Sequence, residues 1–221
     1  LLRGYTTIRD AAGGDIGLKL AIDQGLIKGP RFYFPGLAIS QTGGHGDMRA
    51  PDHEPLCPCG YCGSFSIVAD GPDDVRKAVR EQLRKGASQI KIFVSGGIIS
   101  PSDPIWMNQM TDAEIQAAVE EASTRRSYVM AHAHTAEAVE RCVRHGVRSI
   151  EHATILTSDA AADIARAGAF AVPTLITFKM LVESGKDFGL SESALGKAAE
   201  VERSALNSLA LLYKAGAKIG F

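Results

Sequence analysis

The sequence predicts an α/β fold of the (β/α)8 barrel type, and three observations lead to this prediction. Short apolar runs alternate with helix-like segments along the chain. These runs are continuously apolar, as expected for parallel strands covered on both faces, instead of alternating between polar and apolar residues. No glycine-rich dinucleotide-binding loop follows any of the runs. A barrel therefore fits the pattern better than an open, doubly wound sheet.

Seven apolar runs are predicted to be strands, and their order gives each one a place in the barrel. Counting the first run as strand two makes the run that ends at His132 strand five. Strand one and the end of strand eight are then expected to lie outside residues 1–221, which are predicted to form one catalytic barrel domain. The predicted strands are residues 5–10, 31–36, 88–97, 127–133, 148–153, 169–174 and 217–221.

Helices are predicted between these strands, and several carry clear end signals. Pro72 and two acidic residues stand in the first turn of one helix, where they suit its dipole. Thr111 and Glu114 have the spacing of a capping box at the start of another. Residues 37–71 are expected to be irregular, and one long helical region is expected after residue 174. The other predicted helices are residues 15–25, 135–146 and 158–168.

Composition narrows the choice of partner. The 24 basic and 25 acidic residues give a net charge of −1, so neither nucleic acid nor an anionic membrane surface is expected as a partner. No apolar run reaches the roughly 18 residues of a membrane span. The chain starts without a recognisable secretory signal, and a cytoplasmic location is expected. The expected partner is a small molecule, and assembly into a homo-oligomer is left open.

His132 and His152 end two successive predicted strands. In a (β/α)8 barrel, reactive groups stand at the carboxyl ends of the strands, and neighbouring strands lie about 4.8 Å apart. Two inward imidazoles at these ends can therefore bind one metal ion, and neutral imidazole is a good zinc ligand. A lone strand-end histidine more often makes only a hydrogen bond, so the argument depends on the pair.

Lys91 lies on the predicted strand before His132. Strand alternation places Lys91, Phe93 and Ser95 on one face and the neighbouring aliphatic residues on the other. A buried ammonium is costly, so a lysine that points into a barrel needs a role or a path to solvent. Desolvation lowers the pKa of such an amine, and its neutral form can react with carbon dioxide or with a carbonyl group. Arg9 and Asp10, near the end of the first strand, could pair structurally or contact the substrate, and the structural role is favoured.

Several motifs together resemble the amidohydrolase superfamily, and more narrowly its imidazolonepropionase-like, prolidase-type branch. The motifs are "IKIFVSGG", "VMAHAHTAEAVERCVRHGVRSIEHA", "AFAVPTL" and, after the third strand, "ISQTGGHGD". The resemblance implies a distorted barrel that holds two divalent metal ions, with zinc as the expected metal. It also implies hydrolysis of an amide bond by metal-activated water, with a dipeptide or an N-acyl amino acid as the expected substrate.

The resemblance also assigns roles to individual residues. Lys91 matches the family's carboxylated lysine, whose carbamate bridges the two metals, and His132 and His152 match the ligands of the second metal. His134 stands where close relatives often have a tyrosine that contacts the substrate carboxylate. It is expected to bind substrate there, with capping of the following helix as the alternative. His45 in "GGHGD" is a second candidate for substrate binding. The family's first metal site and general base fall outside residues 1–221.

Other functions stay open at this stage. A cyclic-amide hydrolase or a deaminase of the same superfamily would share the motifs. A Schiff-base aldolase or lyase would use Lys91 but would not need the strand-end histidines. A non-catalytic binding module organised around "CPCGYC" would leave those histidines without a role. Cys57, Cys59 and Cys62 in that motif could bind structural zinc or form a disulfide, and reduced thiols in a long loop are favoured.

Overall fold

The computed structural model describes residues 1–50, 52 and 65–221, and these residues form a partly closed α/β barrel. Seven of the described strands make one parallel sheet in the order β4-β3-β5-β6-β7-β8-β9, and β1 and β2 make a separate parallel pair. This architecture confirms the predicted fold class. The strands are β1 (Thr7–Arg9), β2 (Arg31–Tyr33), β3 (Ala38–Ser40), β4 (Ser66–Val68), β5 (Ile90–Phe93), β6 (Val129–Thr135), β7 (Ser149–Ile155), β8 (Phe170–Val172) and β9 (Lys218–Ile219).

The predicted strand at residues 31–36 is shorter in the structure, because the chain breaks after β2. Pro35 has no N–H to donate to a strand ladder, and Gly36 adopts a left-handed φ of 72°. The next N–H, that of Leu37, donates to the Gln82 side chain at 3.0 Å instead of to a strand. As a result β2 pairs with β1, whereas β3 pairs with β4 and β5.

The prediction that residues 37–71 are irregular is wrong for β3 and β4. Each of these strands has only three residues, too few to show a periodicity of its own. All three residues of β3 are buried, and it is this burial between β4 and β5 that stabilises it as a strand. Cys57, Cys59 and Cys62 lie outside the described residues.

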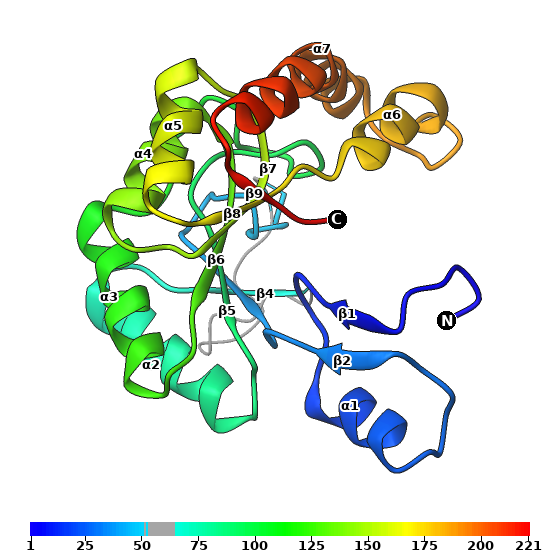
Figure 1. The fold of residues 1–221 in the computed structure, drawn as a ribbon, viewed down its shortest axis with the longest axis vertical. Coiled ribbons are helices and arrows are strands. Elements are labelled where there is room, and N and C mark those ends of the chain that lie inside the picture. Colours follow the sequence, from blue (N-terminus) through cyan, green and yellow to red (C-terminus); the bar gives the residue numbers. More distant parts are fainter. Residues whose placement is uncertain (51, 53–64) are drawn as a thin grey trace.

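The helices that connect β4 through to β8 cover the outer face of the large sheet, as Figure 1 shows. Their apolar faces pack against aliphatic strand residues such as Ile90, Ile92 and Ile150, which are fully buried. Thr111 and Glu114 form the predicted capping box at the start of α3. The bounds of the helices before β8 are α1 (Ile16–Asp23), α2 (Pro72–Arg84), α3 (Asp112–Thr124), α4 (Ala136–Arg144) and α5 (Ser158–Arg166).

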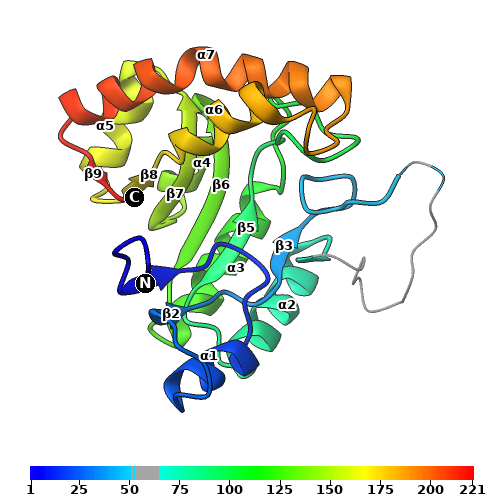
Figure 2. The ribbon, with the colours of Figure 1, turned by 90° about the vertical axis from the view of Figure 1, so that its right-hand side faces the viewer.

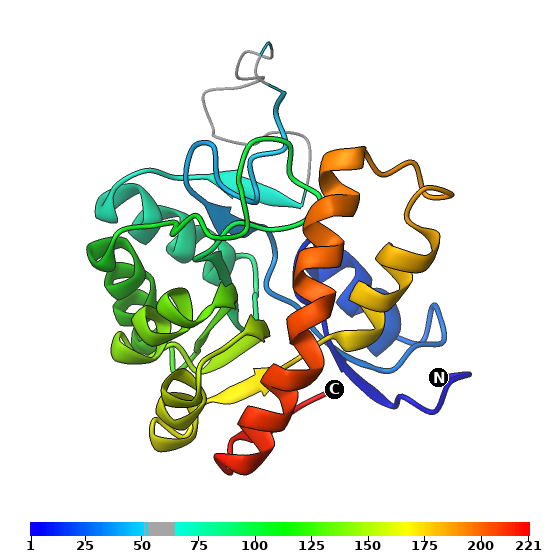
Figure 3. The same cartoon turned by 90° about the horizontal axis from the view of Figure 1, so that it is seen from above.

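The long helical region expected after residue 174 is two helices, α6 (Leu175–Ser184) and α7 (Glu192–Lys214). Figure 2 shows both of them above the ends of the strands, and Figure 3 shows α7 crossing that end of the molecule. Their contact buries a second, smaller apolar cluster that includes Phe178 and Val201. Among the described residues, no helix has the length and hydropathy needed to cross a bilayer.

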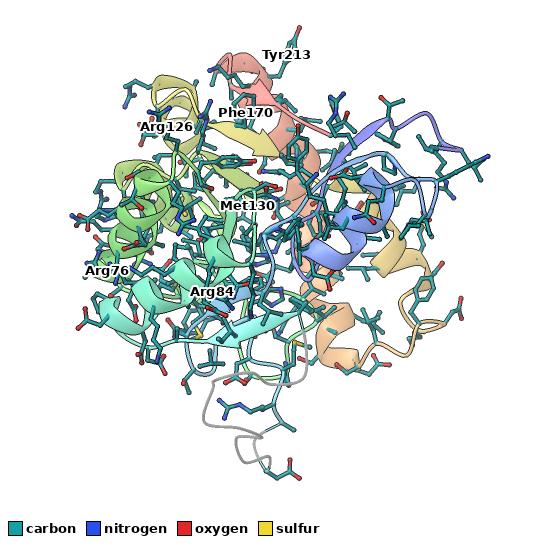
Figure 4. All side chains as sticks on the ribbon, turned by 90° about the horizontal axis from the view of Figure 1, so that it is seen from below. Arg76, Arg84, Arg126, Met130, Phe170 and Tyr213 are labelled. Atoms are coloured by element: carbon teal, nitrogen blue, oxygen red, sulfur yellow. The ribbon has the colours of Figure 1, made fainter. Side chains whose placement is uncertain are left out.

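Buried side chains also lie at the opposite end of the barrel. Met130 is fully buried there and lies near the middle of the view from below, whereas Arg76 and Arg126 lie towards its left side (Figure 4). Arg76 and Arg84 on the outer helices stay in contact with solvent, and a cleft lined by residues of β1, β7 and β8 opens beside the barrel interior.

Candidate active site

The sheet register turns Lys91, Phe93 and His132 to the inside of the barrel. Lys91 pairs with Met130 and Phe93 pairs with His132 between β5 and β6. Paired residues of neighbouring parallel strands point to the same face, and alternation then places His134 on that face too. Lys91, His132 and His134 are all buried, and the prediction of their shared direction is confirmed.

His152 reaches the same interior by a different route. His132 pairs with Glu151, so simple alternation would point His152 outwards, to the helices. Left-handed backbone at His152 and Ala153, with φ of 79° and 49°, reverses this direction. The His152 ring centroid consequently lies 4.6 Å from that of His132 and 5.0 Å from that of His134. Such strained non-glycine residues cost about 1–3 kcal/mol each and concentrate at functional sites.

His45 joins the cluster from the loop that follows β3. Its ring stacks on His132 with centroids 4.3 Å apart, and its Nδ1 lies 2.7 Å from the Ser100 hydroxyl. Its backbone N–H donates to the side-chain oxygen of Gln109 at 2.9 Å. All four histidines singled out from the sequence therefore meet within the barrel mouth.

Hydrogen bonds fix how each imidazole presents its nitrogens. His132 donates from Nε2 to the Gly96 carbonyl at 3.0 Å, and His152 uses Nδ1 to reach the Thr174 hydroxyl at 2.7 Å. Nδ1 of His132 and Nε2 of His152 have no hydrogen-bond partner within the described part of the chain. Metal-binding histidines typically show this arrangement, with one nitrogen held by a protein oxygen and the other left for the metal.

Burial favours the neutral form of the three strand histidines, His132, His134 and His152. Burial lowers the pKa of His132 and His152 well below the usual value, and it lowers the pKa of His134 to about 3. Neighbouring histidines and Lys91 add to each shift, because a second positive charge nearby disfavours protonation. Neutral imidazole is the form that binds metal ions.

Lys91 is only 3% exposed, and burial lowers its pKa to about 8. The charge of Glu151 raises this pKa and that of Arg9 lowers it, so the two partly cancel. No hydrogen bond or ion pair to the Lys91 amine occurs in the part of the chain that the structure describes. Its Nζ lies 5.5 Å from the centroid of the Phe93 ring.

Arg9 has the structural role expected from the sequence. It donates to both carboxylate oxygens of Glu151 at 2.8 Å and to the Ser149 hydroxyl at 2.9 Å. These contacts join β1 to β7 across the barrel interior. Beside them a cleft of about 720 Å³ opens between β1 and the strands β7 to β9, with Thr174 on its wall.

The alternative that His134 caps α4 is wrong. The N-cap of α4 is Thr135, whose hydroxyl accepts a hydrogen bond from the backbone of Ala138. The His134 ring instead has its Nδ1 2.7 Å from the Thr154 hydroxyl and stacks on His152. His134 is thus part of the site.

Sequence reasoning missed several residues that build the site. Phe178 of α6 packs its ring against His134 and His152, with centroids 5.7 and 5.6 Å away. Thr174 has a left-handed φ of 51° and holds His152. Thr174 could have been predicted from the sequence as a site residue, because it is a polar residue at the end of a predicted strand. Phe178 carried none, because it lies on a helix whose position over the strand ends depends on tertiary packing.

The predicted metal ligands are two histidines and a lysine. Among the described residues, no three His, Cys, Asp or Glu side chains are grouped in a way that could hold a metal ion. The predicted ligands include only two such side chains, His132 and His152, because the third ligand is a lysine. The absence of a three-residue group therefore does not test the predicted site. The free ring nitrogens of His132 and His152, together with the buried amine of Lys91, fit a metal site in which the lysine is carboxylated.

The family model for amidohydrolases matches residues 1–221. The chain belongs to the amidohydrolase family. Among solved amidohydrolase-type structures, a prolidase complexed with N-methylphosphonate-L-proline is 47% identical, with a TM-score of 0.95 over 99% of this chain and 54% of that one. A Xaa-Pro dipeptidase with methionine bound in its active site is 34% identical, with a TM-score of 0.88 over 99% and 54%.

An amidohydrolase relative among characterised proteins is ochratoxinase of Aspergillus niger, 34% identical in an alignment of 228 positions that covers 99% of this chain and 47% of that protein. Its crystal structure gives a TM-score of 0.85. These similarities confirm the resemblance to the prolidase-type branch. The chain spans about half the length of the relatives it matches.

Proposed function

We propose that this amidohydrolase chain belongs to a metal-dependent enzyme that hydrolyses the amide bond of a dipeptide or an N-acyl amino acid. The observation that carries the proposal is the pairing of His132 and His152, each with one ring nitrogen free, on the neighbouring strands β6 and β7, with Lys91 on β5 beside β6. The 47% identity to a prolidase supports the choice of substrate class.

Two histidines and one lysine would hold the metal ions. His132 would bind through Nδ1 and His152 through Nε2, and a carbamate on Lys91 would bridge two ions, with zinc as the proposed metal. Amidohydrolases generally use divalent metals. A bound divalent metal supplies polarisation of the scissile carbonyl and a water that ionises near neutral pH.

The chemistry of Lys91 suits carbamate formation. With a pKa of about 8, roughly one amine in ten is neutral at pH 7. The nitrogen lone pair of that neutral amine would attack the carbon of carbon dioxide; a C–N bond would form while one C=O π bond opens to give a carboxylate oxygen, and one proton would leave to solvent. Burial that disfavours the ammonium thus favours the reactive form.

The remaining side chains would bind and orient the substrate. His134 and His45 lie next to the proposed metal ligands, with ring centroids 4.7 and 4.3 Å from His132. Their imidazoles can donate to a substrate carboxylate, and such charge-assisted hydrogen bonds are stronger than neutral ones. Phe178 closes one wall of the site and keeps water from His134 and His152.

A Schiff-base aldolase or lyase is the second candidate, because the lowered pKa of Lys91 would suit it as well. That mechanism gives no reason for the strained backbone at His152. Treatment with borohydride and a carbonyl substrate would trap an adduct on Lys91 only if this second candidate is correct.

The test of the proposal uses the full-length protein and measures both bound metal and hydrolysis of an Xaa-Pro dipeptide. His132→Ala and His152→Ala are each expected to lose at least one metal equivalent and at least about a hundredfold in kcat/KM, because both functions depend on the metal. His145→Ala is the matched control, since His145 is the C-cap of α4 and lies outside the site. Unchanged metal content in both site variants would contradict the proposal.

A further inference from the structure

We infer that Lys197 of α7 is a positioning residue, which fixes the loop after β5 and through that loop the imidazoles of His45 and His132. The inference depends on the proposed function only for its catalytic consequence. Its structural part concerns contacts between α7 and the loop, here called the β5 loop and defined as residues 96–104.

The Lys197 ammonium makes three hydrogen bonds, all to backbone carbonyls of the β5 loop. It donates to Gly97 at 3.1 Å, to Ser100 at 2.9 Å and to Asp103 at 2.7 Å. A lysine ammonium has three donors, so these contacts use all of them. Three carbonyls spread along the loop thereby bind one ammonium group on α7, a helix that lies about 100 residues further along the chain.

A second group of contacts holds the β5 loop closed on itself. The buried carboxylate of Asp103 accepts from the Gly97 backbone at 2.9 Å and from the Gln109 side chain at 3.1 Å. At Gly96 a Cβ atom would lie 1.8 Å from the Pro104 carbonyl oxygen, so only glycine fits there. The loop is therefore compact, and Lys197 adds hydrogen bonds to it from a different element, α7.

The β5 loop is also what holds two of the site histidines. Gly96 accepts the hydrogen bond from His132 Nε2 at 3.0 Å, which leaves Nδ1 of that ring free. Ser100 contacts His45 Nδ1 at 2.7 Å, and the Asp103 carboxylate lies 3.6 Å from the same nitrogen. A shift of the loop would consequently move both imidazoles. Lys197 contacts the loop and the loop contacts the histidines, so Lys197 acts on them indirectly.

The first test is hydrogen exchange, measured by mass spectrometry on the full-length protein. In Lys197→Met, amides of residues 96–104 are expected to exchange at least about tenfold faster, because a methionine has no donors for the three carbonyls. Lys197→Arg, which keeps the charge and the donors, should recover part of the protection. Lys214→Met is the control, since Lys214 is exposed on the same helix. Wild-type exchange rates for the β5 loop in Lys197→Met would overturn the inference.

A purely structural role of Lys197 predicts a different result. It would lower the melting temperature and accelerate exchange throughout the molecule, and that outcome would also overturn the inference. If Lys197→Met does not fold, Lys197→Gln carries the same test, since its amide keeps two of the three donors and faster exchange should still be confined to the loop.

The catalytic consequence is measured separately. Lys197→Met is expected to lower kcat/KM for a dipeptide at least about tenfold while Lys197→Arg retains more activity. Unchanged kcat/KM alongside a loosened loop would overturn the positioning role. A wild-type protein without any hydrolytic activity would instead contradict the proposed function, and the exchange result would still decide whether Lys197 fixes the loop.

Discussion

Lys91 places an ionisable amine where burial disfavours its charged form. Its amine is buried, has no ion-pair partner among the described residues, and has a pKa of about 8 against an ordinary 10.5. The folded protein therefore binds a proton at Lys91 less tightly than the unfolded chain does. At neutral pH both states are protonated, and the folded state bears the full cost of the buried charge.

The lowered pKa of Lys91 in the folded state predicts how the stability of the metal-free protein depends on pH. Between pH 8 and 10.5 the unfolded chain binds more protons at Lys91 than the folded protein does, so the contribution of Lys91 to stability rises with pH, by roughly 3 kcal/mol in total. Lys91→Met should remove this contribution. Denaturant unfolding at pH 7 and pH 10, in buffers free of carbon dioxide, measures it. The same pH dependence in wild type and variant would show that the amine is not desolvated.

His134 allows a sharper test of substrate specificity. It is buried beside His132 and His152 but is not needed as a metal ligand in the proposed scheme. His134→Ala should keep the metals and lower kcat/KM for substrates with a free carboxylate by about ten- to a hundredfold, as for one lost charged hydrogen bond. Amidated analogues should be spared. Equal losses for acid and amide substrates would mean that His134 does not bind the carboxylate.

Alternation along a strand was enough to predict the inward direction of Lys91, His132 and His134. The same rule fails for His152, which faces inwards only because its backbone is left-handed. His152 was found from its place on the next strand and from the family resemblance. Asp103 and Lys197 gave no signal, because their contacts join segments far apart in the sequence and depend on the folded arrangement.

At the scale of elements, the β5 loop and the loop that carries His45 fit together with little free space. A Cβ atom on Gly97 would lie 2.1 Å from Cε1 of His45, well below any normal contact distance. Strands β3 and β4, which anchor the His45 loop, were missed in the sequence because each is only three residues long.

This close packing predicts the effect of one added methyl group. Gly97→Ala should displace His45 and lower kcat/KM at least about tenfold, because the ring has to move away from its contacts with Ser100 and His132. Gly196→Ala on α7 is the control, since nothing lies within 4 Å of its added Cβ. Because alanine favours the helix more than glycine does, Gly196→Ala should raise the free energy of unfolding by up to about 1 kcal/mol. Steady-state kinetics and thermal unfolding of both variants provide the comparison, and full activity in Gly97→Ala would contradict the packing argument.

At the scale of the whole molecule, the two sheets are joined by side chains instead of by a strand ladder. The β1–β2 pair lies apart from the large sheet in Figure 1. Arg9 of β1 and Glu151 of β7, 142 residues apart, make the ion pair that links them. The sequence predicted the fold class and a pairing role for Arg9, but it could not identify Glu151 as the partner.

Removing one member of this pair should cost more than removing both. Arg9→Met leaves the buried Glu151 carboxylate without its partner, at a cost of roughly 3 kcal/mol in the free energy of unfolding. Arg9→Met combined with Glu151→Leu should be less destabilising, since neither member of the pair is then left without its partner. Denaturant unfolding of the two single variants and the double variant completes the cycle. Strictly additive losses would show that the pair does not couple the two sheets.

The central claim is that His132, His152 and Lys91 together hold divalent metal for amide hydrolysis. Anomalous X-ray diffraction from crystals of the full-length protein, collected on either side of the zinc absorption edge, tests it most directly. The account predicts metal peaks about 2.0–2.2 Å from a ring nitrogen of His132 and of His152, with extra density of a carbamate on the Lys91 amine between two ions. Metal-loaded protein with no peak at these imidazoles, or with Lys91 as a free amine remote from the metal, would contradict it.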